Sequence, residues 1–281
     1  MPCTTRAAHP LITEDTGTQG AGRWQLEATL DHHRGHAPGL LTVSDERKLV
    51  LSYGLKDPLD LIVTVPHTRT RTDDTPAVQG RGDVEFAAKW RFFEQQGLSS
   101  GLRPGVTAAT GDEDRGLGTG KTTASLFTIM TYDTAPWAFH LHLGRTDNRT
   151  VSDERRQINH YSLAVARKIG DRLQLVADIS QETNPDKGSN TAIRSALFGA
   201  IYSVNKDFDI DLGYRYGLSD SAADDALLLG LAFRFCPPGD RFTAVHRLHW
   251  IGYIYPLATR RPDRSRMTGD RFPITAFRLE K

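Results

Sequence analysis

The sequence predicts an all-β fold, an antiparallel transmembrane β-barrel of about 12 strands. Three observations support this prediction: apolar and polar residues alternate along most of the chain, the alternating segments are long, and short and long connections take turns between them. No stretch approaches about 18 apolar residues, so a helical membrane span is excluded. The 281 residues carry a formal net charge of +1, so no basic excess points to nucleic acid. Two cysteines are too few for a disulfide framework.

A period of two is typical of a strand with one apolar face. Within residues 83–93, Val84, Phe86 and Trp90 share one face, and Glu85 and Lys89 share the other. Twelve such segments follow one another along the chain, at 23–33, 41–54, 59–66, 82–94, 98–110, 122–132, 136–146, 157–168, 172–182, 191–205, 207–217 and 226–235. Those at 41–54 and 122–132 alternate poorly. Most of the segments are long enough to cross a bilayer as tilted strands, whereas soluble strands average about 5–6 residues.

The connections between these segments alternate in length. The short ones run through 56–58, 95–97, 134–135, 170–171 and residue 206. The long ones cover 34–40, 67–81, 111–121, 146–156, 183–190 and 218–225. Bacterial outer-membrane barrels combine an even strand number with short periplasmic turns and longer extracellular loops. Aromatic residues such as Trp24, Trp90, Trp137 and Tyr214 lie near strand ends, as an interfacial girdle requires.

Several motifs are similar to those of a known family. They are PLITEDTGTQG at 10–20, YGL at 53–55, VP at 65–66, GDV at 82–84 with Lys89, and TGDED at 110–114 followed by GLGTG at 116–120. Together they resemble the outer-membrane family labelled meta-pathway of phenol degradation, whose members are often called transporters. The resemblance covers about residues 10–235. It implies an outer-membrane β-barrel with a transport role, and it supplies no transferable catalytic or binding residues.

The first residues depart from that pattern. Residues 1–9 have neither the basic region nor the apolar run of an export signal, so we expect the signal to lie upstream of the given start. The alternative is a protein retained in the cytoplasm, where exposed strand edges would cause aggregation. We expect residues 1–22 to form an N-terminal periplasmic segment or a plug, and residues 23–235 to form the barrel.

Residues 236–281 form an atypical basic tail. They contain Pro237 and Pro238, show no clear alternation, and carry nine basic residues against four acidic ones. We expect a frameshift or read-through product, or a loosely ordered extension. The alternative is a small periplasmic appendage with a strand at residues 250–255.

A glycine-rich stretch at 116–122 suggests phosphate binding, but Arg115 stands where a P-loop requires glycine, and strand-type sequence follows it. Turn formation is the simpler interpretation. Asp112, Glu113 and Asp114 could attract a divalent cation, although a solvated loop tip is the simpler alternative.

His160 and Ser162 share one strand face, an arrangement similar to that of outer-membrane phospholipase A. A nucleophilic serine needs a base and an orienting partner, and no orienting asparagine is evident downstream. His140 and His142 could bind a metal, but the sequence offers no third ligand. We therefore predict no enzymatic activity, no metal site and no cofactor.

The polar strand faces give the site prediction. A lipid-facing Lys or Arg at the bilayer midplane costs about 2–4 kcal/mol, so we expect these side chains to point into the barrel. The lumen-lining candidates are Glu27, Asp31, Lys48, Asp83, Glu85, Lys89, Arg91, Arg103, His140, His142, His160, Asp178, Asp211, Arg215 and Arg234. Both signs occur, so these residues can pair to hold the barrel in shape or can set selectivity.

These observations predict a bacterial outer-membrane barrel that allows passive or facilitated passage of a small solute. Twelve strands should leave a narrow or partly plugged lumen. The family label suggests an aromatic or other hydrophobic compound, which the mixed-charge lumen does not specifically support. The alternatives are a non-transporting structural barrel, an adhesin that acts through its loops, and an outer-membrane lipase. The expected partners are outer-membrane lipids, the solute, and the barrel-assembly machinery acting on the strand from Leu227 to Phe235.

Overall fold

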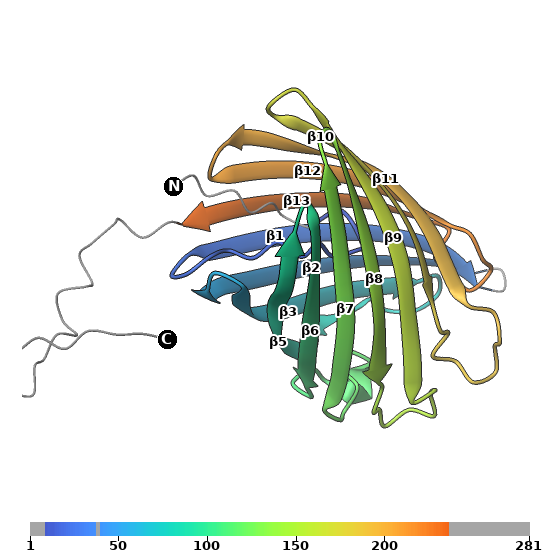
Figure 1. Ribbon diagram of the computed structural model, residues 1–281. Helices are drawn as coiled ribbons and strands as arrows, with labels where there is room; N and C mark the ends of the chain where they lie inside the picture. The colour runs from blue at the N-terminus through green and yellow to red at the C-terminus, as the bar shows by residue number, and fades with distance from the viewer. Residues whose placement is uncertain (1–8, 38–39, 236–281) are drawn as a thin grey trace, which may run out of the picture. The chain divides into compact units, whose positions relative to one another are not determined.

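The computed structural model describes residues 9–37 and 40–235 (Figure 1). Thirteen β-strands and one short 3-10 helix, η1 (Glu113–Arg115), make up its regular structure. The strands are β1 (Trp24–Ala37), β2 (Leu40–Lys56), β3 (Leu59–Thr72), β4 (Val78–Arg81), β5 (Val84–Gln95), β6 (Leu98–Ala108), β7 (Thr123–Thr134), β8 (Trp137–Asp147), β9 (Gln157–Ile169), β10 (Leu173–Glu182), β11 (Ile193–Asn205), β12 (Phe208–Gly217) and β13 (Asp225–Phe235). The atypical tail at 236–281 lies outside the described residues.

All the strands except β4 close into one antiparallel barrel (Figure 1). Each strand pairs with its neighbour along the chain, and β1 pairs with β13 over Trp24–Arg34 to close the ring. Closure satisfies the backbone groups that an open sheet edge would leave unpaired, which a barrel requires in lipid. The predicted all-β barrel of 12 long strands is therefore confirmed.

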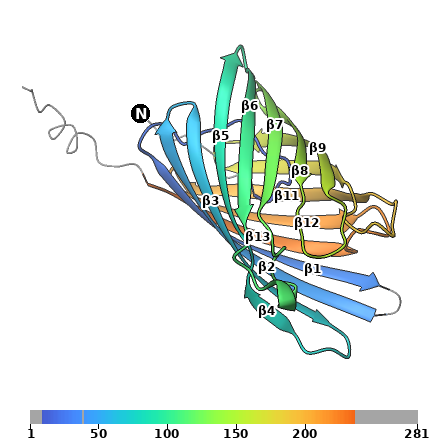
Figure 2. The same cartoon turned by 90° about the horizontal axis from the view of Figure 1, so that it is seen from below.

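Two predicted loops are instead strand. β1 and β2 remain paired as far as Ala37 and Leu40, where the prediction placed a long connection. β3 continues through Pro66 to Thr72, and β4 folds back onto it (Figure 2). Pro66 has no N–H to donate, and it lies where β3 has left its pairing with β5 and has not yet begun its pairing with β4. The proline predicted the end of this strand, but it marks only the point where β3 changes from pairing with β5 to pairing with β4.

Side chains alternate between an exposed apolar face and a buried polar face. On the outer face, Leu49 and Leu126 are each 54% exposed. On the inner face, Asp60, Asp209 and Asp211 are almost completely buried. This arrangement inverts that of a soluble protein, in which apolar side chains occupy the interior, and it suits a barrel surrounded by lipid. Within the described part of the chain, no helix is long and apolar enough to cross a membrane.

The connections separate into two ends of the barrel. At the short-turn end, strands join through only a few residues, as at Gln96 and Gly97, which both have positive φ. An added Cβ at Gly97 would meet the Asp133 carbonyl oxygen, so this turn requires glycine. At the long-loop end, most connections are longer, although β1 and β2 are joined by residues 38–39 alone, and the connection from β6 to β7 carries η1. Aromatic pairs lie near both ends, Trp24 with Tyr53 and Tyr214 with Tyr216.

Candidate functional site in the lumen

The interior of the barrel contains residues 9–20, here called the N-terminal segment. This segment has no regular secondary structure, so its buried backbone N–H groups need partners from the barrel wall. Asp178 on β10 accepts hydrogen bonds from the N–H groups of Ile12 and Thr13 at 3.1 and 2.7 Å. Asp60 on β3 accepts from the Gln19 N–H at 3.0 Å. Two inward-facing aspartates therefore hold the backbone of the segment.

Apolar contacts anchor the first part of the segment. Leu11 packs against a buried cluster on the inner wall that includes Val176, Leu197 and Leu228. Pro10 lies so close to β12 that a Cβ added at Gly213 would come within 2.7 Å of it. Full burial of a leucine side chain contributes roughly 1.5–3 kcal/mol, and the partly buried Leu11 contributes a fraction of that to docking.

An ionic cluster anchors the middle of the segment. The Glu14 carboxylate lies 3.3 Å from Lys89 Nζ and 3.1 Å from Arg103 Nε. Arg103 also donates two hydrogen bonds to Glu85, at 2.8 and 2.9 Å. Lys89 and Arg103 are nearly buried, so each carries a cost of desolvation that these carboxylates offset. Three of the predicted lumen residues, Glu85, Lys89 and Arg103, thus come together around one residue of the segment.

A second ionic cluster lies nearer the long-loop end. His9 contacts Asp31 at 3.2 Å and forms a short hydrogen bond with Asp211. On the neighbouring strand, Lys48 Nζ lies 2.8 Å from a carboxylate oxygen of Glu46. Arg215 Nη2 lies 3.0 Å from His33 Nδ1. Four more predicted lumen residues, Asp31, Lys48, Asp211 and Arg215, therefore lie in one network.

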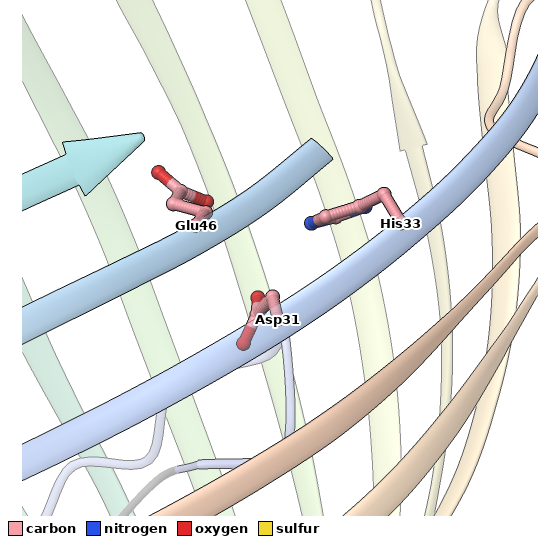
Figure 3. A group of neighbouring side chains, drawn as sticks. All are labelled: Asp31, His33 and Glu46. Atoms are coloured by element: carbon pink, nitrogen blue, oxygen red, sulfur yellow. The ribbon is translucent and has the colours of Figure 1, made fainter. Parts of the chain in front are cut away.

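Asp31, His33 and Glu46 have the donor types of a metal site. One possible ligand atom from each lies within 4.8 Å of the other two, and Figure 3 shows the three side chains gathered on β1 and β2. Each already has a protein partner, however: His9 for Asp31, Arg215 for His33 and Lys48 for Glu46. A divalent cation would have to displace these groups and would face the charges of Lys48 and Arg215. The donor set therefore fits a charge-balanced network better than a metal.

Two cavities flank the N-terminal segment. A cavity of about 240 Å³ near the short-turn end is lined by Thr16, Ser99, Thr131 and His140. A second, of about 280 Å³, lies against Glu14, Lys89 and Arg103. Both have walls of mixed polarity, and their polar side chains can hydrogen-bond to water or to a small polar solute.

The other predicted lumen residues have individual partners. Arg234 donates to Asp209 at 2.5 Å and to Gln25 at 3.1 Å. Glu27 accepts from Gln25 at 2.6 Å, and Arg91 lies 3.2 Å from Glu94. The remaining contacts are those of His140 with Thr131, at 3.0 Å, and of His142 with the His160 ring, at 5.2 Å between centroids.

Asp83 departs from the prediction. It lies in the connection between β4 and β5, so strand alternation does not set its direction. Its carboxylate accepts hydrogen bonds from the N–H groups of Thr110, Gly111 and Thr119 at 2.7–2.9 Å. Burial alone would raise the pKa of Asp83, but the N–H donors of Thr119 and Gly111 lower it overall. Asp83 is thus the anchor of a long loop instead of a lumen residue.

The same loop explains the glycine-rich stretch. Asp112 caps η1 by accepting from the Arg115 N–H, and Gly116 follows in the left-handed conformation. β7 begins at Thr123, so no helix follows the stretch as a P-loop requires. These residues form a structured loop end without the geometry of a phosphate site.

Ser162, His160 and Glu182 lie in sequence along the lumen wall. Ser162 Oγ is 3.1 Å from His160 Nε2, and His160 Nδ1 is 3.4 Å from Glu182. The structure therefore supplies an acidic neighbour for the histidine that the sequence analysis missed. Ser162 is only 4% exposed and lines neither cavity beside the N-terminal segment. A hydrolase also needs substrate access and donors for an oxyanion, so this trio is better explained as wall packing.

The sequence analysis also missed His9, His33 and Glu46. His33 and Glu46 lie two residues from Asp31 and Lys48 on the same strand faces, so strict alternation could have found them. His9 lies outside any strand, and periodicity gives no signal for it.

Fold and site together define an antiparallel barrel of the outer-membrane type with an occupied lumen. Residues 39–235 match the family described as "Putative MetA-pathway of phenol degradation", and the chain belongs to that family. No curated protein matches the chain.

Solved structures share the fold. An outer membrane channel of the COG4313 group from Pseudomonas putida F1 superposes with a TM-score of 0.67 at 16% identity, covering 79% of this chain and 98% of that one. The KdgM porin superposes with a TM-score of 0.52 at 7% identity, covering 75% of this chain and 99% of that one. At these identities the likeness establishes the barrel fold.

Proposed function

We propose that this protein is a narrow outer-membrane channel for passive or facilitated passage of a small solute, with the N-terminal segment as its internal plug. The observation that carries the proposal is the pair of partly polar cavities beside that segment inside a closed barrel. Passage requires a route past the segment, and each cavity offers part of one. The channel and porin folds of the similar structures support the same function.

The plug is held by contacts that can be exchanged. Its backbone is bound through side chains such as Asp60 and Asp178, without strand pairing to the wall. A shift of the segment would therefore break these hydrogen bonds, the Glu14 ion pairs and the Leu11 contact, but would leave the barrel ladder intact. Water or a polar solute can replace the lost polar contacts, so opening need not unfold the protein.

The charge of the lumen sets the expected class of solute. Lys89 and Arg103 face Glu14 and Glu85, so the wall presents both signs and no strong field of one sign. Small neutral or zwitterionic polar solutes fit such a wall. An aromatic solute, which the family description suggests, would have to use the apolar patch of Val176, Leu197 and Leu228 where Leu11 now packs.

The proposal includes the orientation of the barrel and its route of assembly. Short turns face the periplasm in barrels of this type, so the long-loop end faces the outside. We infer that β13, which alternates from Ala226 and ends at Phe235, is the strand that the assembly machinery recognises. The proposal assigns no catalysis to the chain.

Conductance of the full-length protein in planar bilayers tests the function. We expect small, discrete openings, which should become larger when Asp60 and Asp178 are both replaced by alanine. Asp153→Ala is a matched control, because its side chain is 90% exposed in a loop. Liposome swelling with neutral and aromatic solutes then compares the substrate classes. If neither the wild type nor the double variant conducts ions or admits solutes, the proposal is wrong.

A further inference from the structure

A row of basic side chains crosses the outer face of β2, β3 and β4. Arg47 lies directly opposite His67, and His67 lies directly opposite Arg81. Arg47 and Arg81 therefore place positive charge on both sides of His67, and a bound anion would interact favourably with both guanidinium groups. Among the described residues, no hydrogen bond or ion pair involves any of these three side chains. Arg47 and Arg81 are exposed, and each can turn its guanidinium toward a ligand.

Other basic residues lie beside this row, toward the long-loop end, and form one basic patch with it. Arg69 and Arg71 follow His67 at intervals of two on β3, so they share its outer face. Asp45, which lies opposite Arg69, is engaged by His32 at 2.7 Å. The patch therefore keeps an excess of positive charge.

An apolar groove adjoins the basic row. It encloses about 730 Å³, is lined by outward side chains such as Leu30, Leu49, Val65 and Leu229, and has Arg47, His67 and Arg81 on its border. Leu49 is 54% exposed and Leu229 is 43% exposed, so the groove is unfilled by the protein itself. Apolar surface beside unpaired cations matches an amphiphile with an anionic head.

The height of the row fits a lipid headgroup. His67 is eight residues along β3 from Leu59, which starts at the short-turn end. At about 3.3 Å per residue and a tilt of about 40°, this places the row about 20 Å from that end of the strand. The apolar band of an outer-membrane barrel is about 25 Å tall, so the row lies near its outer edge, where lipid phosphates lie.

We propose that this face binds a phosphate-bearing glycolipid of the outer leaflet. Arg47, His67 and Arg81 hold the phosphate, and an acyl chain lies in the groove beside Leu49 and Leu229. Arginine suits this role because its planar fork makes two parallel hydrogen bonds to a phosphate. The inference uses the outer-membrane placement of the barrel but does not depend on solute passage, since it concerns the opposite face of the wall.

Native mass spectrometry of the full-length protein in detergent tests the site. The probe is diphosphoryl lipid A, compared with the same lipid after removal of both phosphates. We expect the phosphorylated lipid to bind and to survive detergent removal. The double variant Arg47→Gln/Arg81→Gln should weaken binding by about tenfold or more, because two charge-assisted contacts are lost. Replacement of Arg47 and Arg81 by lysine should restore part of the binding.

The matched control is Arg145→Gln. Arg145 is exposed on the outer face of β8, near the same end of the barrel, and its partner Gln157 is uncharged. Arg145→Gln removes one positive charge from the outer face and keeps the basic tail at residues 236–281, as the double variant does. It should bind the lipid as the wild type does. A heat-dependent gel shift confirms that each variant is folded. Equal binding of the dephosphorylated lipid, full binding by the double glutamine variant, or a dimer formed through this face would overturn the proposal.

Discussion

Glu14 and Lys89 form an ion pair inside the barrel, with 3.3 Å between the carboxylate and Nζ. The pair joins the N-terminal segment to β5. Arg103, on the neighbouring strand β6, also contacts Glu14. A carboxylate in the segment thus meets two cations that strand alternation had placed on the inner face. Many of the charged side chains in the lumen therefore serve to bind the N-terminal segment.

Removal of the Glu14 charge should loosen the segment. Among the described residues, Glu14→Gln leaves Lys89 with one ion pair, to the more distant Asp15 at 3.9 Å. Breaking one side of a buried pair costs about 3 kcal/mol, so docking of the segment should weaken while the barrel remains closed. We expect larger conductance in planar bilayers and easier protease cleavage within residues 9–20. Lys187→Gln, which breaks an exposed pair with Asp153, should change neither measurement.

Asp178→Ala should free two backbone amides. The Ile12 and Thr13 N–H groups would lose the Asp178 carboxylate as their acceptor and would exchange faster with deuterium. A lost hydrogen bond to a charged group is worth about 1.5–3 kcal/mol. Hydrogen exchange followed by mass spectrometry should therefore show faster uptake at residues 9–20 and unchanged uptake in β10. Asp178→Asn keeps an acceptor oxygen and should have a smaller effect; equal effects of the two variants would contradict this account.

Gly213→Ala should displace the segment by steric contact alone. The new Cβ would lie 2.7 Å from Pro10 Cβ, closer than side chains pack. Because the barrel backbone is held by strand pairing, Pro10 is the group that must move. We expect a lower melting temperature of the segment's docking transition and an increased conductance. Gly35→Ala is a control, since its Cβ would make ordinary contacts beginning at 3.5 Å. If both variants raised the conductance to a similar extent, the effect would come from any methyl group added to the wall, and the contact with Pro10 would not be its cause.

The sequence predicted the strands well and the lumen only in part. Alternation placed Lys89, Arg103 and Asp178 on the inner strand faces. It could do so because successive side chains of a strand point to opposite faces, so the apolar neighbours of each residue fix its direction. The same rule failed for Asp83, which precedes β5 and bends away to bind the loop. The contacts of Glu14 were beyond sequence reasoning, because they depend on how a segment without periodicity folds back into a closed barrel.

The β3–β4 extension shows the same limit. Residues 67–81 contain polar and basic side chains on both faces, so no apolar face marks them as strand. Their pairing follows from closure of the sheet and from the departure of β3 from β5 after Thr64. Long-range pairing decided the structure there, and local pattern carried no information about it.

Acid should release the loop that Asp83 anchors. The pKa of this carboxyl lies below its usual value of 3.8, because the N–H donors of Thr119 and Gly111 favour the charged form more than burial opposes it. A depressed pKa means that the carboxylate stabilises the loop above the ordinary pKa of the unfolded chain. This stabilisation is lost as the pH falls through the lower, folded value. Amide exchange at Gly111 and Thr119 should therefore remain slow, after correction for intrinsic rates, at pH 5–7 and become fast only below about pH 4. Asp83→Asn should show fast exchange already at pH 7, because an amide group lacks the charge that strengthens these bonds. Slow exchange in this variant at pH 7 would mean that the loop is held by other contacts, such as the Asp112 cap of η1.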